Sequence, residues 1–220
     1  MPREKLVRGL LVPVLFSLAP AAFRTGLLWR IEPWLCYLTG AVLVLSQPAI
    51  PFNPGAREYR DPADRYSALA IHAMVFLAAG AAAVHFVLYP LEMSSEVRYA
   101  AIVAGFLLAV AGLTVRIWSI RTLGRCFTPT VRIHPDHELI QSGPYRWIRH
   151  PSYLGATAAV CAPAVIYGAW LLVPVTLIAL LVAYSYRIRI EDRALHERFG
   201  HDFERYARQA GALCPRIFRP

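Results

Sequence analysis

Residues 142–155 read Ser-Gly-Pro-Tyr-Arg-Trp-Ile-Arg-His-Pro-Ser-Tyr-Leu-Gly and lead into an apolar run of 34 residues at 153–186. This run is too long for one membrane-spanning helix, which needs about 20 residues. Three residues that disfavour a continuous helix interrupt the run: Pro163, Gly168 and Pro174. Because membrane helices tolerate such breaks when neighbours satisfy the freed backbone groups, we expect a helical hairpin with its turn near 162–169.

The composition indicates an integral membrane protein. Of 220 residues, 57% are hydrophobic and only 17% are charged, whereas soluble domains are nearer a quarter charged. Further apolar spans are expected at 9–23, 31–50, 67–89 and 99–118. The predicted fold is an all-α polytopic membrane helix bundle: four spans, the C-terminal hairpin and a cytosolic surface helix at 191–209. We expect one integrated domain, with the N-terminal spans in residues 1–120 and a C-terminal functional region with the membrane hairpin in 121–220.

The basic residues predict the topology. If the N-terminus is cytoplasmic, 19 of the 23 Lys and Arg residues fall in inside segments. The outside loops hold only Arg24, Arg30 and Arg98, and Arg116 sits near the end of a span. This asymmetry predicts cytoplasmic N- and C-termini and explains the net charge of +9 without a nucleic-acid partner. The ratio of 22 Arg to one Lys suggests a GC-rich bacterial genome, and we therefore expect a protein of a bacterial inner membrane. The first span also resembles a signal peptide ending at 19–21, but we expect it to be retained.

Polar residues crowd the entrance of the hairpin, where they are costly and indicate a functional site. Pro151 fits the first position of a helix. The N–H groups of Ser152, Tyr153 and Leu154 would then point out of the helix end and form an anion-binding arrangement beside His150. The alternative is an ordinary helix start with interfacial anchors.

A second polar group follows the hairpin. Arg187 and Glu191 are four residues apart and share one helix face. They form either a simple ion pair or two arms that diverge toward different ligands. In the second case, Arg187 would hold a carboxylate and Glu191 would accept hydrogen bonds from ribose hydroxyls or an amine.

No metal site is expected. His134 and His137 lie in the loop before the hairpin, but a third cluster of ligands with matching spacing is missing. The four cysteines show no C-x-x-C spacing, so they indicate neither a zinc site nor a disulfide framework.

Two motifs carry a family resemblance. The first is Gly143-Pro144-Tyr145-x-x-x-Arg149-His150-Pro151-x-Tyr153-x-Gly155; the second is Glu191-Asp192-x-x-Leu195-x-x-x-Phe199-Gly200-x-x-Phe203-x-x-Tyr206, followed by Pro215. Together they resemble the isoprenylcysteine carboxyl methyltransferase family over roughly residues 120–218. The chain departs from the family at Asp192, where Glu is frequent, and at Phe203, where Tyr is common.

The resemblance implies an S-adenosylmethionine-dependent membrane methyltransferase that takes a lipophilic acceptor from the bilayer. The implied cofactor residues are Thr130, His137, Glu138, Leu139, Ile140, Tyr145, His150, Pro151, Ser152, Tyr153 and Glu191. Arg187 matches the substrate-contacting arginine of the family, and Arg187 and Arg149 are the candidate catalytic residues.

The chemistry agrees with this expectation, because a carboxylate acceptor is already ionised at pH 7 and its methylation needs placement more than a general base. Three alternatives remain open. They are methylation of a phospholipid amine or another small lipophilic acceptor, an NADPH-dependent isoprenoid reductase, and a membrane scaffold without catalysis.

Overall fold

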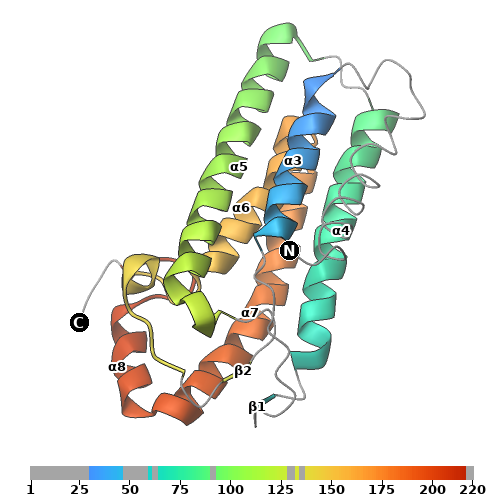
Figure 1. The fold of residues 1–220 in the computed structure, drawn as a ribbon. Coiled ribbons are helices and arrows are strands. Elements are labelled where there is room, and N and C mark those ends of the chain that lie inside the picture. Colours follow the sequence, from blue (N-terminus) through green and yellow to red (C-terminus); the bar gives the residue numbers. More distant parts are fainter. Residues whose placement is uncertain are drawn as a thin grey trace.

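A computed structural model describes residues 30–46, 59–60, 64–89, 93–127, 132–133 and 137–216. Most of these residues lie in a bundle of long helices, with the short helix α8 at one end (Figure 1). The α-helices are α3 (Ile31–Leu45), α4 (Asp64–Leu88), α5 (Ser95–Leu123), α6 (Pro151–Ile166), α7 (Leu172–Phe199) and α8 (His201–Gln209). The short elements are β1 (Tyr59–Arg60), η2 (Gly124–Cys126), β2 (Arg132–Ile133) and η3 (Gly143–Arg146), with β1 antiparallel to β2.

The predicted helical membrane fold is confirmed. Three helices of the described part are long and apolar enough to cross a membrane: Ala70–Leu88, Ser95–Cys126 and Leu172–Phe199. The apolar helices α3 and α6 are shorter. The expected span at 9–23, its possible cleavage and the end of the 31–50 span lie outside the described residues.

Helices α5 and α6 pack closely because small residues face each other. The buried residues of α5 are Ala101, Gly105, Ala109, Gly112, Arg116 and Ser119. A Cβ atom placed on Gly112 would lie 2.6 Å from the carbonyl oxygen of Gly155 on α6. Such small residues let helix backbones approach where lipid provides no hydrophobic drive for association. This contact brings the start of α6 against α5.

The hairpin is present, but the expected turn near 162–169 begins too early. Helix α6 continues through Pro163 to Ile166, and the turn occupies 167–171. Pro163 therefore does not end the helix, as membrane helices permit. Pro174 lies in the first turn of α7, where a missing N–H is harmless.

The separate surface helix predicted at 191–209 is wrong. Residues 191–199 continue α7, and the break comes at Gly200, whose φ of +52° ends one helix and precedes α8. The change from apolar to polar residues did not break the helix, since Arg and Glu are good helix formers. The 99–118 span is also longer than expected and runs over Ser95–Leu123, with the Ser94 side chain accepting a hydrogen bond from the N–H of Val97.

Candidate active site

The backbone before α6 is held against the segment that follows α8. The N–H of Arg149 donates to the carbonyl of Gly211 at 2.7 Å, and the N–H of His150 donates to Ala212 at 3.0 Å. Pro151 is the first residue of α6, as predicted. However, the N–H of Tyr153 donates to the carbonyl of His150, so the predicted anion-binding helix end is partly satisfied by the chain itself.

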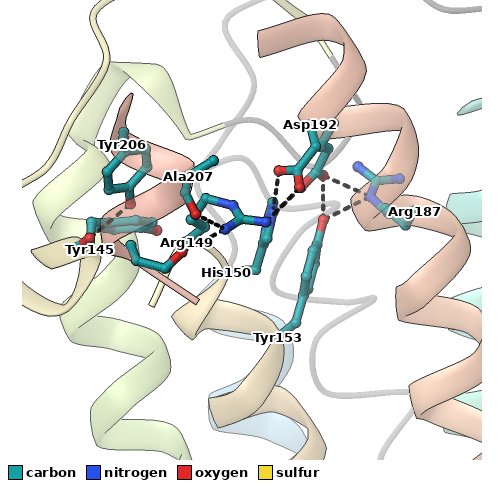
Figure 2. Close-up of polar contacts among 10 residues, drawn as sticks. Tyr145, Arg149, His150, Tyr153, Arg187, Asp192, Tyr206 and Ala207 are labelled. Carbon is teal, nitrogen blue, oxygen red and sulfur yellow. Dashed lines mark hydrogen bonds and ion pairs between the residues drawn. The ribbon is translucent and has the colours of Figure 1, made fainter. Parts of the chain in front are cut away.

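Six side chains from this segment, α6 and α7 form one network, which we name the polar cluster (Figure 2). Its members are Arg149, His150, Tyr153, Arg187, Glu191 and Asp192. They come from positions up to 43 residues apart in the sequence. Exposure of the charged side chains ranges from 3% at Arg187 to 23% at Asp192.

His150 lies between two carboxylates. Its Nε2 is 2.9 Å from Oδ1 of Asp192, and its Nδ1 is 3.2 Å from Oε2 of Glu191. Burial alone would lower the pKa of His150, but the hydrogen bonds and negative charges of Asp192 and Glu191 raise that pKa to about 9. The ring is therefore an imidazolium at neutral pH, and both nitrogens donate.

Arg187 pairs with Glu191 rather than diverging from it. Its Nε donates to Oε1 of Glu191 at 3.0 Å and to the hydroxyl of Tyr153 at 2.9 Å. The Tyr153 hydroxyl in turn donates to the same carboxylate oxygen. On the other side, Nη1 of Arg187 donates to Oγ of Ser67 on α4 at 3.0 Å. The two residues expected to face separate ligands thus form the simple ion pair in this structure.

Arg149 contacts α7 and the end of α8. Its Nη2 lies 2.9 Å from Oδ2 of Asp192, and its Nη1 donates to the carbonyl of Ala210 at 2.6 Å and that of Ala207 at 3.3 Å. Figure 2 shows this guanidinium between the carboxylate of Asp192 and the end of α8. Arg149, one of the two predicted catalytic arginines, is therefore engaged with α7 and the end of α8.

The polar cluster consists of charged groups that pair with one another. Arg149, His150 and Arg187 are cationic, whereas Glu191 and Asp192 are the two carboxylates. Removal of one partner would leave the other as a costly buried charge.

A pocket of about 380 Å³ adjoins α8. Its lining is His137, Glu138, Leu139, Gln141, Phe199, Asp202, Arg205, Tyr206 and Gln209. Three predicted cofactor residues, 137–139, are therefore among its walls. The other described residues of the prediction are not: Ile140, Tyr145, His150, Pro151, Ser152, Tyr153 and Glu191. Thr130 lies outside the described residues.

Tyr145 and Tyr206 connect the pocket with the segment before α6. The hydroxyl of Tyr206 donates to the carbonyl of Tyr145 at 2.8 Å, and the hydroxyl of Tyr145 donates to the carbonyl of Ser119 at 3.4 Å. Burial raises the pKa of both phenols, which keeps them protonated as donors. Ser152 faces α5 instead, because its Oγ accepts from Nη1 of Arg116 at 2.9 Å.

Sequence reasoning missed several members of the site. Asp192 was quoted in the family motif but not placed in the site. Arg116 is 6% exposed within a membrane-length helix, and an arginine at that depth was itself a signal of a polar site. No local feature of the sequence indicated Ser67 or the α8 residues.

Among the described residues, no group of three or more His, Cys, Asp or Glu could hold a metal ion, and His134 lies outside them.

The fold and the site define a class: an integral membrane protein with a buried polar cluster at one end of a helical bundle. The model of the isoprenylcysteine carboxyl methyltransferase (ICMT) family matches residues 103–197, which contain the whole polar cluster. The fold resembles a solved eukaryotic intramembrane Ras methyltransferase ICMT with a TM-score of 0.53 and 21% identity, covering 95% of this chain and 73% of that chain.

Curated proteins give the same result. The chain is 34% identical over 116 residues to a probable protein-S-isoprenylcysteine O-methyltransferase of Oryza sativa subsp. indica, covering 51% of this chain and 60% of that protein. It is 32% identical over 121 residues to the protein-S-isoprenylcysteine O-methyltransferase of Saccharomyces cerevisiae, covering 52% of this chain and 49% of that protein. It is 34% identical over 83 residues to the uncharacterized protein YpbQ of Bacillus subtilis, covering 38% of this chain and 49% of that protein. The chain thus spans about half the length of these relatives, and the resemblance to the ICMT family is confirmed.

Proposed function

We propose that this protein is an S-adenosylmethionine-dependent membrane methyltransferase that methylates the carboxylate of an isoprenylcysteine-like lipophilic acceptor. One observation carries the proposal: the segment that matches the ICMT family contains a buried cluster of charged side chains that includes the guanidinium of Arg187. A lipophilic carboxylate would complement that guanidinium and would reach it from the bilayer. The excess of Arg in the expected inside segments supports a cytoplasmic site and cytoplasmic termini in a bacterial inner membrane.

The pocket beside α8 supports the proposed cofactor. The pocket volume of about 380 Å³ lies within the range of small-molecule sites. Phe199 and Tyr206 offer aromatic surface for an adenine ring, and the carboxylates of Glu138 and Asp202 offer further hydrogen-bond acceptors. The family resemblance proposes these cofactor residues: Thr130, His137, Glu138, Leu139, Ile140, Tyr145, His150, Pro151, Ser152, Tyr153 and Glu191. Of these, residues 137–139 line the pocket, whereas the Ser152 hydroxyl is bound by Arg116.

The proposed reaction requires the protein mainly to bind and orient the two reactants. S-adenosylmethionine, when bound, supplies an electrophilic methyl group on its sulfonium. The planar guanidinium of Arg187 would hold the acceptor carboxylate by its fork of N–H groups. Glu191 would accept hydrogen bonds from ribose hydroxyls or from the cofactor amine. Since the carboxylate is ionised at pH 7, a general base is not required, and the residues orient the reactants and exclude water.

The test measures binding and transfer separately. The full chain in detergent is titrated with S-adenosylmethionine by calorimetry, and labelled methyl transfer to a small prenylcysteine is followed. We expect Glu191→Ala to abolish cofactor binding, because it removes the proposed acceptor. We expect Arg187→Ala to retain most cofactor binding and to lose transfer.

Arg193→Ala is the matched control, because Arg193 is an exposed arginine of the same helix. Its binding and transfer should equal those of the wild type. Cofactor binding without transfer to prenylcysteine would keep the methyltransferase and refute the acceptor, and ethanolamine lipids would then be tested. Absence of cofactor binding in a folded sample would refute the proposal and favour a reductase or a scaffold.

A further inference from the structure

The carboxylate of Asp192 is shared by two cations that precede α6. Oδ1 lies 2.9 Å from Nε2 of His150, and Oδ2 lies 2.9 Å from Nη2 of Arg149. Asp192 and Glu191 are adjacent on α7, but they have different partners except for His150, which touches both. Asp192 therefore joins the group around Glu191 to the group around Arg149.

Arg149 extends this connection to α8. Its Nη1 binds the carbonyls of Ala210 and Ala207 where α8 ends. The carbonyl groups at a helix end lack partners within the helix, and a cation is favoured there by the helix dipole. Thus a continuous chain of contacts runs from α8 through Arg149, Asp192 and His150 to Glu191.

Helix α8 also forms a wall of the pocket. Asp202, Arg205, Tyr206 and Gln209 line it together with residues 137–139. A displacement of α8 would therefore change the shape of the pocket. The chain that follows α8 is held separately. Gly211 and Ala212 form backbone hydrogen bonds with residues 147–150.

We infer that Asp192 is a positioning residue, which couples the docking of α8 to the orientation of Glu191 through Arg149 and His150. Arg149 then acts as the anchor of α8 and not as a catalytic residue. Because the backbone contacts of Gly211 and Ala212 do not depend on the Asp192 side chain, loss of that carboxylate loosens α8 without unfolding the bundle. The inference about cofactor affinity rests on the proposed function, whereas the coupling to α8 does not.

The experiment compares Asp192→Asn, Asp192→Glu and wild type by hydrogen exchange of the amides of α8 and by calorimetry with S-adenosylmethionine. Asp192→Asn should speed exchange in α8 and weaken cofactor binding about tenfold or more, as expected for the loss of charged hydrogen bonds. Asp192→Glu keeps two carboxylate oxygens and should restore both properties to near wild type. Glu197→Gln, which changes an exposed carboxylate of the same helix, should change neither.

The outcomes are distinct. If wild type does not bind S-adenosylmethionine, the proposed function fails, and exchange in α8 still tests the coupling. If Asp192→Asn leaves α8 exchange unchanged, the coupling is refuted, whatever the cofactor does. If Asp192→Glu fails to restore either property, Asp192 serves only general folding and the inference is overturned. A similar unfolding midpoint of all variants shows that the bundle is intact.

Discussion

Enlarging Gly112 by one methyl group tests the idea that a close α5–α6 contact positions the site. A Cβ atom at Gly112 would lie 2.6 Å from the carbonyl oxygen of Gly155 and 2.8 Å from the backbone nitrogen of Ala159. The first distance is 0.8 Å shorter than the 3.4 Å at which ordinary contact begins. Both neighbours are backbone atoms, so relief requires α6 to move away from α5.

The magnitude follows from two opposing effects. Overpacking of this kind costs about 1–3 kcal/mol. Replacing Gly by Ala inside a helix returns up to about 1 kcal/mol through propensity. Because rigid backbone atoms meet, the first effect should prevail with a net loss of about 2 kcal/mol, near its upper range. For a chain of this length, that loss lowers Tm by roughly 4–8 °C.

The assay is thermal unfolding of Gly112→Ala in detergent, with cofactor calorimetry alongside. Cofactor binding should weaken as well, because the displaced α6 carries Tyr153 and follows His150 directly. Ala111→Val, on the exposed side of α5, is the control and should leave Tm nearly unchanged. A Tm for Gly112→Ala equal to that of wild type would refute the reasoning, since the helices would then have room to spare.

Two further predictions concern the polar cluster. The pKa of His150 is raised to about 9 from an ordinary value of 6.5, so its stabilisation is complete below pH 6.5 and is lost as pH rises through 9. The free energy of unfolding should fall by up to about 3 kcal/mol across that window, and His150→Gln should remove this dependence; a flat profile in wild type would contradict the assigned charge. Ser67→Ala removes the 3.0 Å hydrogen bond to Nη1 of Arg187 and should raise the KM of the acceptor about tenfold with little change for the cofactor. Ser185→Ala, an exposed serine of α7, is its control, and equal KM values in the two variants would refute a role for Ser67.

Much of the fold could be predicted from local patterns. Apolar runs of membrane length indicated the long helices, because the bilayer imposes that length and requires internal hydrogen bonding. The hairpin was predicted, but its turn was expected too early, since a Pro inside a membrane helix need not end it. The continuity of α7 through 191–199 was missed for a similar reason: polarity marks the membrane boundary, whereas the helix ends only at Gly200.

The sequence by itself determined the class of protein and two motifs that hold His150, Tyr153, Arg187 and Glu191. These properties depend on hydropathy and on residues near one another along the chain. Only the tertiary structure decided which partners those side chains have. Ser67 lies 120 residues from Arg187, and Arg149 lies 61 residues from Ala210, yet each pair is hydrogen-bonded. The spacing of residues along the chain does not predict such pairs. The packing of α4, α7 and α8 sets the distances between their side chains, and the cost of burying charge selects among the possible partners.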